Sequence, residues 1–220
     1  MPAGGSVPAR PGGRRNPRPM RLDFRFSERP LEDLWCEAVV AFVFRKTFLT
    51  QGVLSGLDAK MGGLLGRLEA AGFWTAERGE KLLVASEGRI RAEKLLLCGL
   101  GEGSDRVSPV PADWAAGAGR VLLGLRISDL AIHVPMREGE EADYPARLEA
   151  SVENLAAPYL EAYGGSADHA LKIVFSIERF FSGGLLPVAD RLRSRFGPEF
   201  DLSVVVERER SRAVGARRRT

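Results

Sequence analysis

The sequence predicts an α/β fold with a mixed, mostly parallel β-sheet between layers of helices, because strand-like and helix-like segments alternate along most of its length. Residues 95–98 form an unbroken apolar run, which is typical of a strand that is covered on both faces. We therefore expect the strands within 81–103 to form the middle of the sheet. With 45% apolar residues in a chain of 220, the protein can bury a full hydrophobic core.

Side-chain patterns predict the elements of the first third of the chain. Residues 20–26 alternate apolar and polar side chains, as a half-exposed strand at a sheet edge would. Residues 36–44 are rich in β-branched and aromatic side chains, which indicates a buried strand. Apolar residues recur at helical spacing within 58–71, so we expect one amphipathic helix there despite Gly62 and Gly63, after a loop that ends at Gly56.

The rest of the chain continues the alternation. A turn at 86–88 joins a predicted strand at 81–85 to the apolar strand at 94–100. Prolines near the starts of the helical segments at 112–125 and 184–196, and glycines after the ends of those at 144–163 and 184–196, support these boundaries. The remaining predictions are helices at 112–125, 144–163 and 184–196, and strands at 130–136, 171–177 and 200–206.

Charge and composition separate the ends of the chain from its body. Residues 1–19 contain five prolines and four glycines, and residues 207–220 contain six arginines against two glutamates. Neither segment has the apolar content needed to offset the entropy of ordering. We therefore expect a disordered basic tail at 1–19, one domain at 20–206 and a second disordered basic tail at 207–220.

No apolar segment approaches the length needed to cross a bilayer, and the first twenty residues lack the apolar core of a secretory signal. We therefore expect a cytoplasmic protein with no membrane contact. The only cysteines, Cys36 and Cys98, both lie in apolar surroundings. We expect buried thiols that act as small hydrophobic groups, and neither a disulfide nor a metal site.

Several short sequence features lie between residues 48 and 136, and their order and spacing are informative together. These features are Leu57-Asp58 at a helix start, Gly79-Glu80 before a strand, Gly99-Leu100-Gly101 at a strand exit, Ala115-Ala116-Gly117 in a helix, and Val134-Pro135 after a strand. Together they resemble the N-terminal domain of the leucyl (cytosol) aminopeptidase family. The resemblance implies a three-layer, macro-domain-like fold.

The resemblance does not extend to the chemistry of that family. Its peptidase site lies in a separate C-terminal domain, where a lysine and several carboxylates hold two metal ions. The Asn-Thr-Asp-Ala-Glu-Gly-Arg segment of that site does not occur in this sequence. The resemblance therefore implies no catalytic residues, no metal and no cofactor here, and no aminopeptidase activity.

Glycine-rich segments supply the candidate anion sites. From residue 164 onward, the predicted strand, loop and helix resemble the phosphate-binding part of macro domains that bind ADP-ribose, although the Asn-rich segment and triple-glycine loop of those domains are missing. Helix N-terminal amides would face an anion at Ser182, Gly183 and Gly184, with a flexible loop as the alternative. Gly99 and Gly101 follow a strand and could also expose amides, with a structural turn as the alternative.

The histidines and the arginine-rich tails have simpler interpretations. His133 and His169 are far apart in the sequence, and each is expected to be structural, with its hydrogen bonds satisfied. The tails could contact nucleic-acid phosphates weakly, but they carry no aromatic residues to stack on bases. The candidate phosphate contacts are Arg14, Arg15, Arg217, Arg218 and Arg219.

These observations favour a stand-alone, non-catalytic module with a role in protein assembly or regulation, whose partner is another protein or a second copy of the chain. Two alternatives remain. The first is a macro-like protein that binds ADP-ribose or another nucleotide. The second is an accessory part of a metallo-aminopeptidase whose catalytic domain lies on another chain.

Overall fold

The computed structural model describes residues 19–45, 53–102, 112–135, 141–177 and 184–207, which form a seven-stranded sheet in the order β3-β4-β2-β5-β6-β1-β7. Neighbouring strands are parallel except β3 and β4, which are antiparallel. The strands are β1 (Arg21–Ser27), β2 (Ala38–Arg45), β3 (Lys81–Ala85), β4 (Lys94–Glu102), β5 (Asp129–His133), β6 (Ala170–Ser176) and β7 (Asp201–Glu207).

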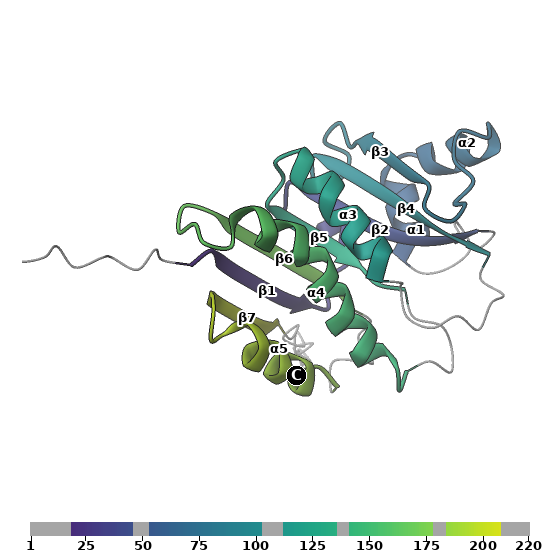
Figure 1. Ribbon diagram of the computed structural model, residues 1–220. Helices are drawn as coiled ribbons and strands as arrows, with labels where there is room; N and C mark the ends of the chain where they lie inside the picture. Colours follow the sequence, from purple (N-terminus) through teal and green to yellow (C-terminus); the bar gives the residue numbers. More distant parts are fainter. Residues whose placement is uncertain (1–18, 46–52, 103–111, 136–140, 178–183, 208–220) are drawn as a thin grey trace, which may run out of the picture.

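Helices cover the sheet on both faces (Figure 1). On one face lie α3 (Ala112–Gly124), α4 (Tyr144–Tyr163) and α5 (Leu185–Phe196). On the other lie the short helix η1 (Leu31–Asp33) with α1 (Val53–Lys60) and α2 (Leu64–Ala70). The mixed, mostly parallel sheet between helix layers is the architecture that the sequence predicted. None of the described helices combines the length and the apolar content that a membrane crossing requires, and a cytoplasmic location stays a prediction.

The larger core lies beneath α3, α4 and α5. Phe24 of β1 packs edge-to-face on Phe196 of α5, with ring centroids 5.6 Å apart, so the sheet and this helix are joined by an aromatic contact. Helices α3 and α4 approach closely at Gly119. A Cβ atom there would lie 2.5 Å from the Leu155 carbonyl oxygen, so only glycine fits at this crossing.

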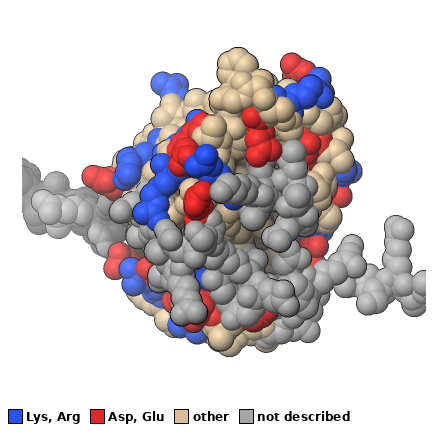
Figure 2. All heavy atoms as spheres, turned by 90° about the vertical axis from the view of Figure 1, so that its right-hand side faces the viewer, with Lys and Arg blue, Asp and Glu red and all other residues tan. Residues whose placement is uncertain are grey.

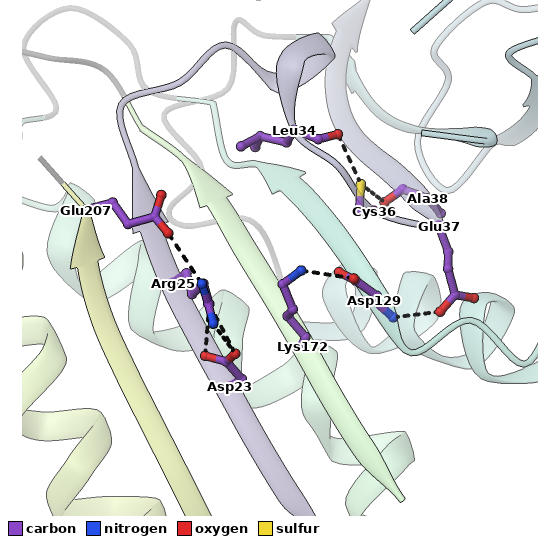
Figure 3. A network of polar contacts seen from close by, with 9 residues as sticks. All are labelled: Asp23, Arg25, Leu34, Cys36, Glu37, Ala38, Asp129, Lys172 and Glu207. Atoms are coloured by element: carbon purple, nitrogen blue, oxygen red, sulfur yellow. Dashed lines mark hydrogen bonds and ion pairs between the residues drawn. The ribbon is translucent and has the colours of Figure 1, made fainter. Parts of the chain in front are cut away.

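The second helix layer covers only part of its face. It lies over β4 and β2, whereas the same face of β6, β1 and β7 carries charged side chains that pair with one another (Figure 3). Arg25 lies between Asp23, at 2.8 Å, and Glu207, at 3.6 Å. Lys172 contacts Asp129 at 2.9 Å. This half of the face is polar because no helix covers it.

Two strand predictions are wrong in their position. β1 was expected at a sheet edge, but it lies between β6 and β7. Polar side chains alternate with apolar ones along β1 because one face of the sheet has no helix above it in this region. β4 is next to the edge strand β3, and β5 is the central strand. Residues 95–98 are apolar because helices cover both faces at β4, which does not require a central position. β3, predicted to be buried, alternates partly buried and exposed residues because it is an edge strand.

The single helix predicted at 58–71 is two helices. Gly62 and Gly63 have φ values of +69° and +73°, which interrupt the helical path between α1 and α2. The carboxylate of Asp58 accepts a hydrogen bond from the Leu65 amide at 2.8 Å and so satisfies a donor at the start of α2. The expected loop before residue 56 is shorter than predicted, because α1 already begins at Val53.

Candidate functional site at the carboxyl edge of the sheet

The six parallel strands end at the same edge of the sheet, which faces the right-hand side of Figure 1. From β2 the chain continues to the β4 side of the sheet, and from β5 it continues to the β6 side, so the strand order reverses between β2 and β5. In open α/β sheets, ligands bind outside the carboxyl ends of the strands at such a reversal. Figure 2 views this edge and shows acidic and basic side chains interspersed among the described residues that are visible around it.

Three polar side chains form a row across the last residues of the strands. In the parallel register, Ser27 of β1 is paired with Ser176 of β6, which is paired with His133 of β5. Their exposed fractions are 1%, 4% and 8%, so the row is buried. The Ser176 hydroxyl donates a hydrogen bond to the Arg29 carbonyl oxygen at 2.9 Å, and the Ser27 hydroxyl accepts one from the Arg29 amide at 3.4 Å. The two serines are therefore satisfied by the segment that follows β1.

His133 differs from the two serines of this row. Its Nδ1 atom is buried and has no hydrogen-bond partner, contrary to the satisfied structural histidine that the sequence predicted. Burial lowers the pKa of the imidazole to about 4, and a backbone hydrogen bond to Ser176 only partly opposes that effect. The ring is therefore neutral at neutral pH, and its buried Nδ1 atom has no hydrogen-bond partner.

Helix α4 holds the chain where it leaves β5. The Tyr144 hydroxyl donates a hydrogen bond to the Val134 carbonyl at 3.2 Å, and an Arg147 guanidinium nitrogen donates one to the Pro135 carbonyl at 3.1 Å. Both side chains are buried, at 0% and 7% exposure. Arg147 was not predicted as a functional residue from the sequence. Its position three residues after Tyr144, beside the apolar stripe of α4, was the available signal.

Helix α5 begins at this same edge, because the crossover from β6 to the parallel strand β7 sends the helix back across the sheet. Gly184 precedes its first residue, and neither a side-chain cap nor an acidic residue occupies its first turn. The N-terminal amides of α5 therefore lack a protein anion among the described residues. Of the predicted anion site, Ser182 and Gly183 lie outside the described residues, and Gly184 lies at the start of the helix.

The other predicted glycine site is not an anion site. Gly99 and Gly101 lie inside β4, and their amides donate to the carbonyls of Glu80 and Ala76 at 2.8 and 2.9 Å. A Cβ atom on Gly99 would lie 2.2 Å from the Glu77 carbonyl oxygen. These glycines allow the segment before β3 to pack against β4, so their amides are not free for a ligand.

The remaining sequence candidates have structural roles or lie outside the described residues. His169 stacks on Tyr163 with ring centroids 3.9 Å apart, and its Nδ1 lies 3.0 Å from the Ser166 hydroxyl. Burial raises the pKa of the Cys36 and Cys98 thiols to about 12, so both are unreactive free thiols. Within the described ranges, no group of three or more His, Cys, Asp or Glu could hold a metal ion. The arginines of the tails lie outside those ranges, and their contacts with phosphates stay a prediction.

The sheet order and the covering helices define a macrodomain-like α/β fold. A macrodomain of Oceanobacillus iheyensis superposes with a TM-score of 0.53 at 11% identity, over 77% of this chain and 93% of that one. A tomato leucine aminopeptidase superposes with a TM-score of 0.54 at 12% identity, over 73% of this chain and 35% of that one. At this identity the likeness shows the fold alone.

Residues 39–161 match the model of the cytosol aminopeptidase family, N-terminal domain, and the chain belongs to this family. A probable cytosol aminopeptidase of Synechocystis sp. is 30% identical over 112 residues, which cover 51% of this chain and 23% of that protein. The matched region is thus about a quarter of the length of this relative. The family resemblance expected from the sequence is confirmed.

Proposed function

We propose that this chain is a non-catalytic recognition module that binds an anionic, nucleotide-type ligand at the carboxyl edge of its sheet. The observation that carries the proposal is the buried, unpartnered Nδ1 atom of His133 in the row of strand ends. A buried polar atom without a partner costs about 1–3 kcal/mol, so a ligand that supplies the missing hydrogen bond gains that free energy on binding.

The α5 N-terminus supports the anionic character of the ligand. Its uncapped amides lie at the same edge as His133, and such amides favour phosphate groups. ADP-ribose is a suitable probe because it combines a diphosphate with hydroxyl and base groups that can hydrogen-bond to a neutral imidazole. His133 and the α5 amides would then read different parts of one molecule.

Two observations support a role in binding without catalysis. The family match is to an N-terminal domain, and the described residues contain no candidate metal cluster. His133, whose pKa is about 4, is a poor general base near neutral pH because proton transfer is most efficient when the catalytic pKa lies close to the working pH. A leucine anilide assay with manganese checks this proposal, and release that a chelator abolishes would contradict it.

Calorimetric titration with ADP-ribose tests the ligand. We expect binding by the wild-type chain and about tenfold weaker binding by His133→Phe, since one hydrogen bond contributes about 1.4 kcal/mol. His169→Phe is the matched control, because His169 lies away from this edge, stacked on Tyr163. No heat at millimolar ADP-ribose would overturn the ligand assignment.

A role in protein assembly is the second candidate. The aminopeptidase relative is about four times as long as the matched region, and the family model describes one domain of such proteins. This domain therefore occurs together with further protein in that relative, which favours a role in assembly. In this view the chain is an accessory part that contacts another protein. Co-purification with a catalytic aminopeptidase chain from the native cell would support it, and a chain that purifies alone at native abundance would contradict it.

A further inference from the structure

A hollow lies at the opposite edge of the sheet, where β2 and β4 begin. It has a volume of about 590 Å³ and lies between η1, the end of α1 and the 86–93 connection from β3 to β4. Its lining includes Trp35 from the segment before β2 and Arg91 from that connection. The main chain joins the two sides weakly, through the Arg91 amide and the Glu32 carbonyl at 3.5 Å.

Trp35 and Arg91 form a stacked pair on the surface of this hollow. The guanidinium carbon of Arg91 lies 4.8 Å from the centre of the Trp35 ring, in a cation–π contact. Trp35 is nevertheless 66% exposed, which is unusual for so large an apolar side chain. The contact fixes the plane of the guanidinium and leaves its edge, which carries the N–H donors, available to a partner.

Most of the other charges around the hollow are engaged in ion pairs. Lys60 pairs with Asp33, Arg89 pairs with Glu87 at 3.0 Å, and Glu93 pairs with Lys94 at 3.1 Å. The buried carboxylate of Glu32 lies against α1, where a Cβ atom on Gly56 would be 2.8 Å from its Oε1.

Arg91 has no ion pair or side-chain hydrogen bond to any of the described residues. One carboxylate oxygen of Glu32, Oε2, also lacks a hydrogen-bond partner, but it is buried. The uncommitted groups at the surface of the hollow are therefore the Arg91 guanidinium and the indole beside it. This combination is complementary to a carboxylate that lies next to an apolar side chain.

We propose that Trp35 and Arg91 are the docking point for an acidic peptide segment of a partner protein. A carboxylate of the segment accepts two parallel hydrogen bonds from the Arg91 guanidinium, and a neighbouring apolar side chain covers Trp35. Tryptophan and arginine are among the residue types that most often dominate protein interfaces, and these two side chains are already in contact in the chain without a partner. The arginine-rich ends of this chain carry the wrong charge to occupy the point themselves.

The test is a titration with the capped peptide Leu-Asp-Phe-Glu-Leu, followed by the NMR signals of the Trp35 indole N–H and the Arg91 Nε–H. The control peptide carries Asn and Gln in place of Asp and Glu. We expect both signals to shift with the acidic peptide only. Arg91→Gln and Trp35→Ala should each weaken its binding at least tenfold, whereas Arg89→Gln, which removes an engaged arginine of the same hollow, should change it less than twofold.

Three results would overturn the proposal. The first is an absence of shifts at millimolar acidic peptide, and the second is equal binding of the neutral peptide. The third is a dimer of this chain that Trp35→Ala dissociates, because the hollow would then be an interface between two copies. ADP-ribose binding is measured on the same variants. Because the two sites lie at opposite edges, we expect it to be unchanged, so failure here is distinguishable from failure of the proposed ligand site.

Discussion

Two rows of polar side chains on the same sheet face are built in opposite ways. The outer row contains Asp23 and Arg25 of β1, Lys172 of β6 and Asp129 of β5, which are joined in ion pairs (Figure 3). Asp23 is buried, and the other three side chains are partly exposed. The inner row lies two to four residues further along the same strands. It contains two neutral serines and His133, and the segment after β1 covers it.

The comparison shows how cover determines the chemistry of a sheet face. Where water reaches the strands, full charges persist because solvent screens them and opposite charges lie nearby. Where the chain covers the strands, the polar groups are uncharged, and burial keeps the imidazole neutral. The outer row also contains a buried atom without a partner, Asp129 Oδ1, but the same carboxylate is paired with Lys172 through Oδ2. The imidazole of the inner row is neutral and its Nδ1 lacks a partner, which is why we assign recognition to the inner row.

Adding the same charge on each side of Arg25 should show the largest difference between covered and uncovered positions. Val174 of β6 and Val205 of β7 both pair with Arg25, but they are 5% and 37% exposed. We expect Val174→Asp to lower the free energy of unfolding by about 4 kcal/mol, from lost apolar burial and a buried carboxylate. Val205→Asp should change it by less than about 1 kcal/mol. Urea unfolding measures both changes in the free energy of unfolding. Equal changes would show that the burial of Val174 and the exposure of Val205 do not distinguish the two positions.

The pH dependence of stability tests the inner row. The pKa of His133 is about 4 in the folded chain and 6.5 in a model peptide, so the unfolded chain binds the proton first as the pH falls. His133 therefore leaves stability intact above pH 6.5 and lowers it between pH 6.5 and 4, by about 3 kcal/mol in total. We expect His133→Asn to remove most of this loss in urea unfolding at pH 7 and pH 4.5. The same loss in both proteins would contradict the assignment.

The outer row should contribute much less. A double-mutant cycle with Lys172→Met and Asp129→Asn should give a coupling of about 0.5–1 kcal/mol that decreases in 1 M salt, because both side chains are about one-third exposed. A coupling above 2 kcal/mol that salt does not change would show that this row is buried in solution.

The tails should affect the folded domain least of all. Deletion of residues 1–19 and 208–220 should leave the urea midpoint unchanged and abolish retention on DNA at low salt, because the arginines there carry the excess positive charge. Unchanged retention after the deletion would exclude the tails as the nucleic-acid contact.

Periodicity in the sequence predicts most elements because it reports which side of each element is covered. The bounds of α4, Tyr144 to Tyr163, agree with its predicted range. The same reasoning fails where cover is uneven within one face. The alternation of β1 suggested an edge strand, but it reflects a missing helix above an interior strand. Strand order depends on contacts between distant segments, which no local pattern contains.

The candidate site was less predictable than the fold. The burial of His133 was evident from its apolar strand, but the missing partner of its Nδ1 depends on the neighbouring strands and the register of Ser176. Gly99 and Gly101 suggested an exposed loop, yet they serve the close packing of residues 76–79 against β4. A glycine needed for packing and a glycine needed for a ligand have the same sequence signal.

The ring nitrogens of His133 give the most direct test of the central claim. The chain has two histidines, so nitrogen NMR at pH 7 can follow both side chains at once, with His169 as the internal reference. On titration with ADP-ribose, we expect the Nδ1 signal of His133 to shift as it gains a hydrogen bond, while the His169 signals stay in place. Saturable binding with an unchanged His133 spectrum, or no binding at millimolar ligand, would contradict the account.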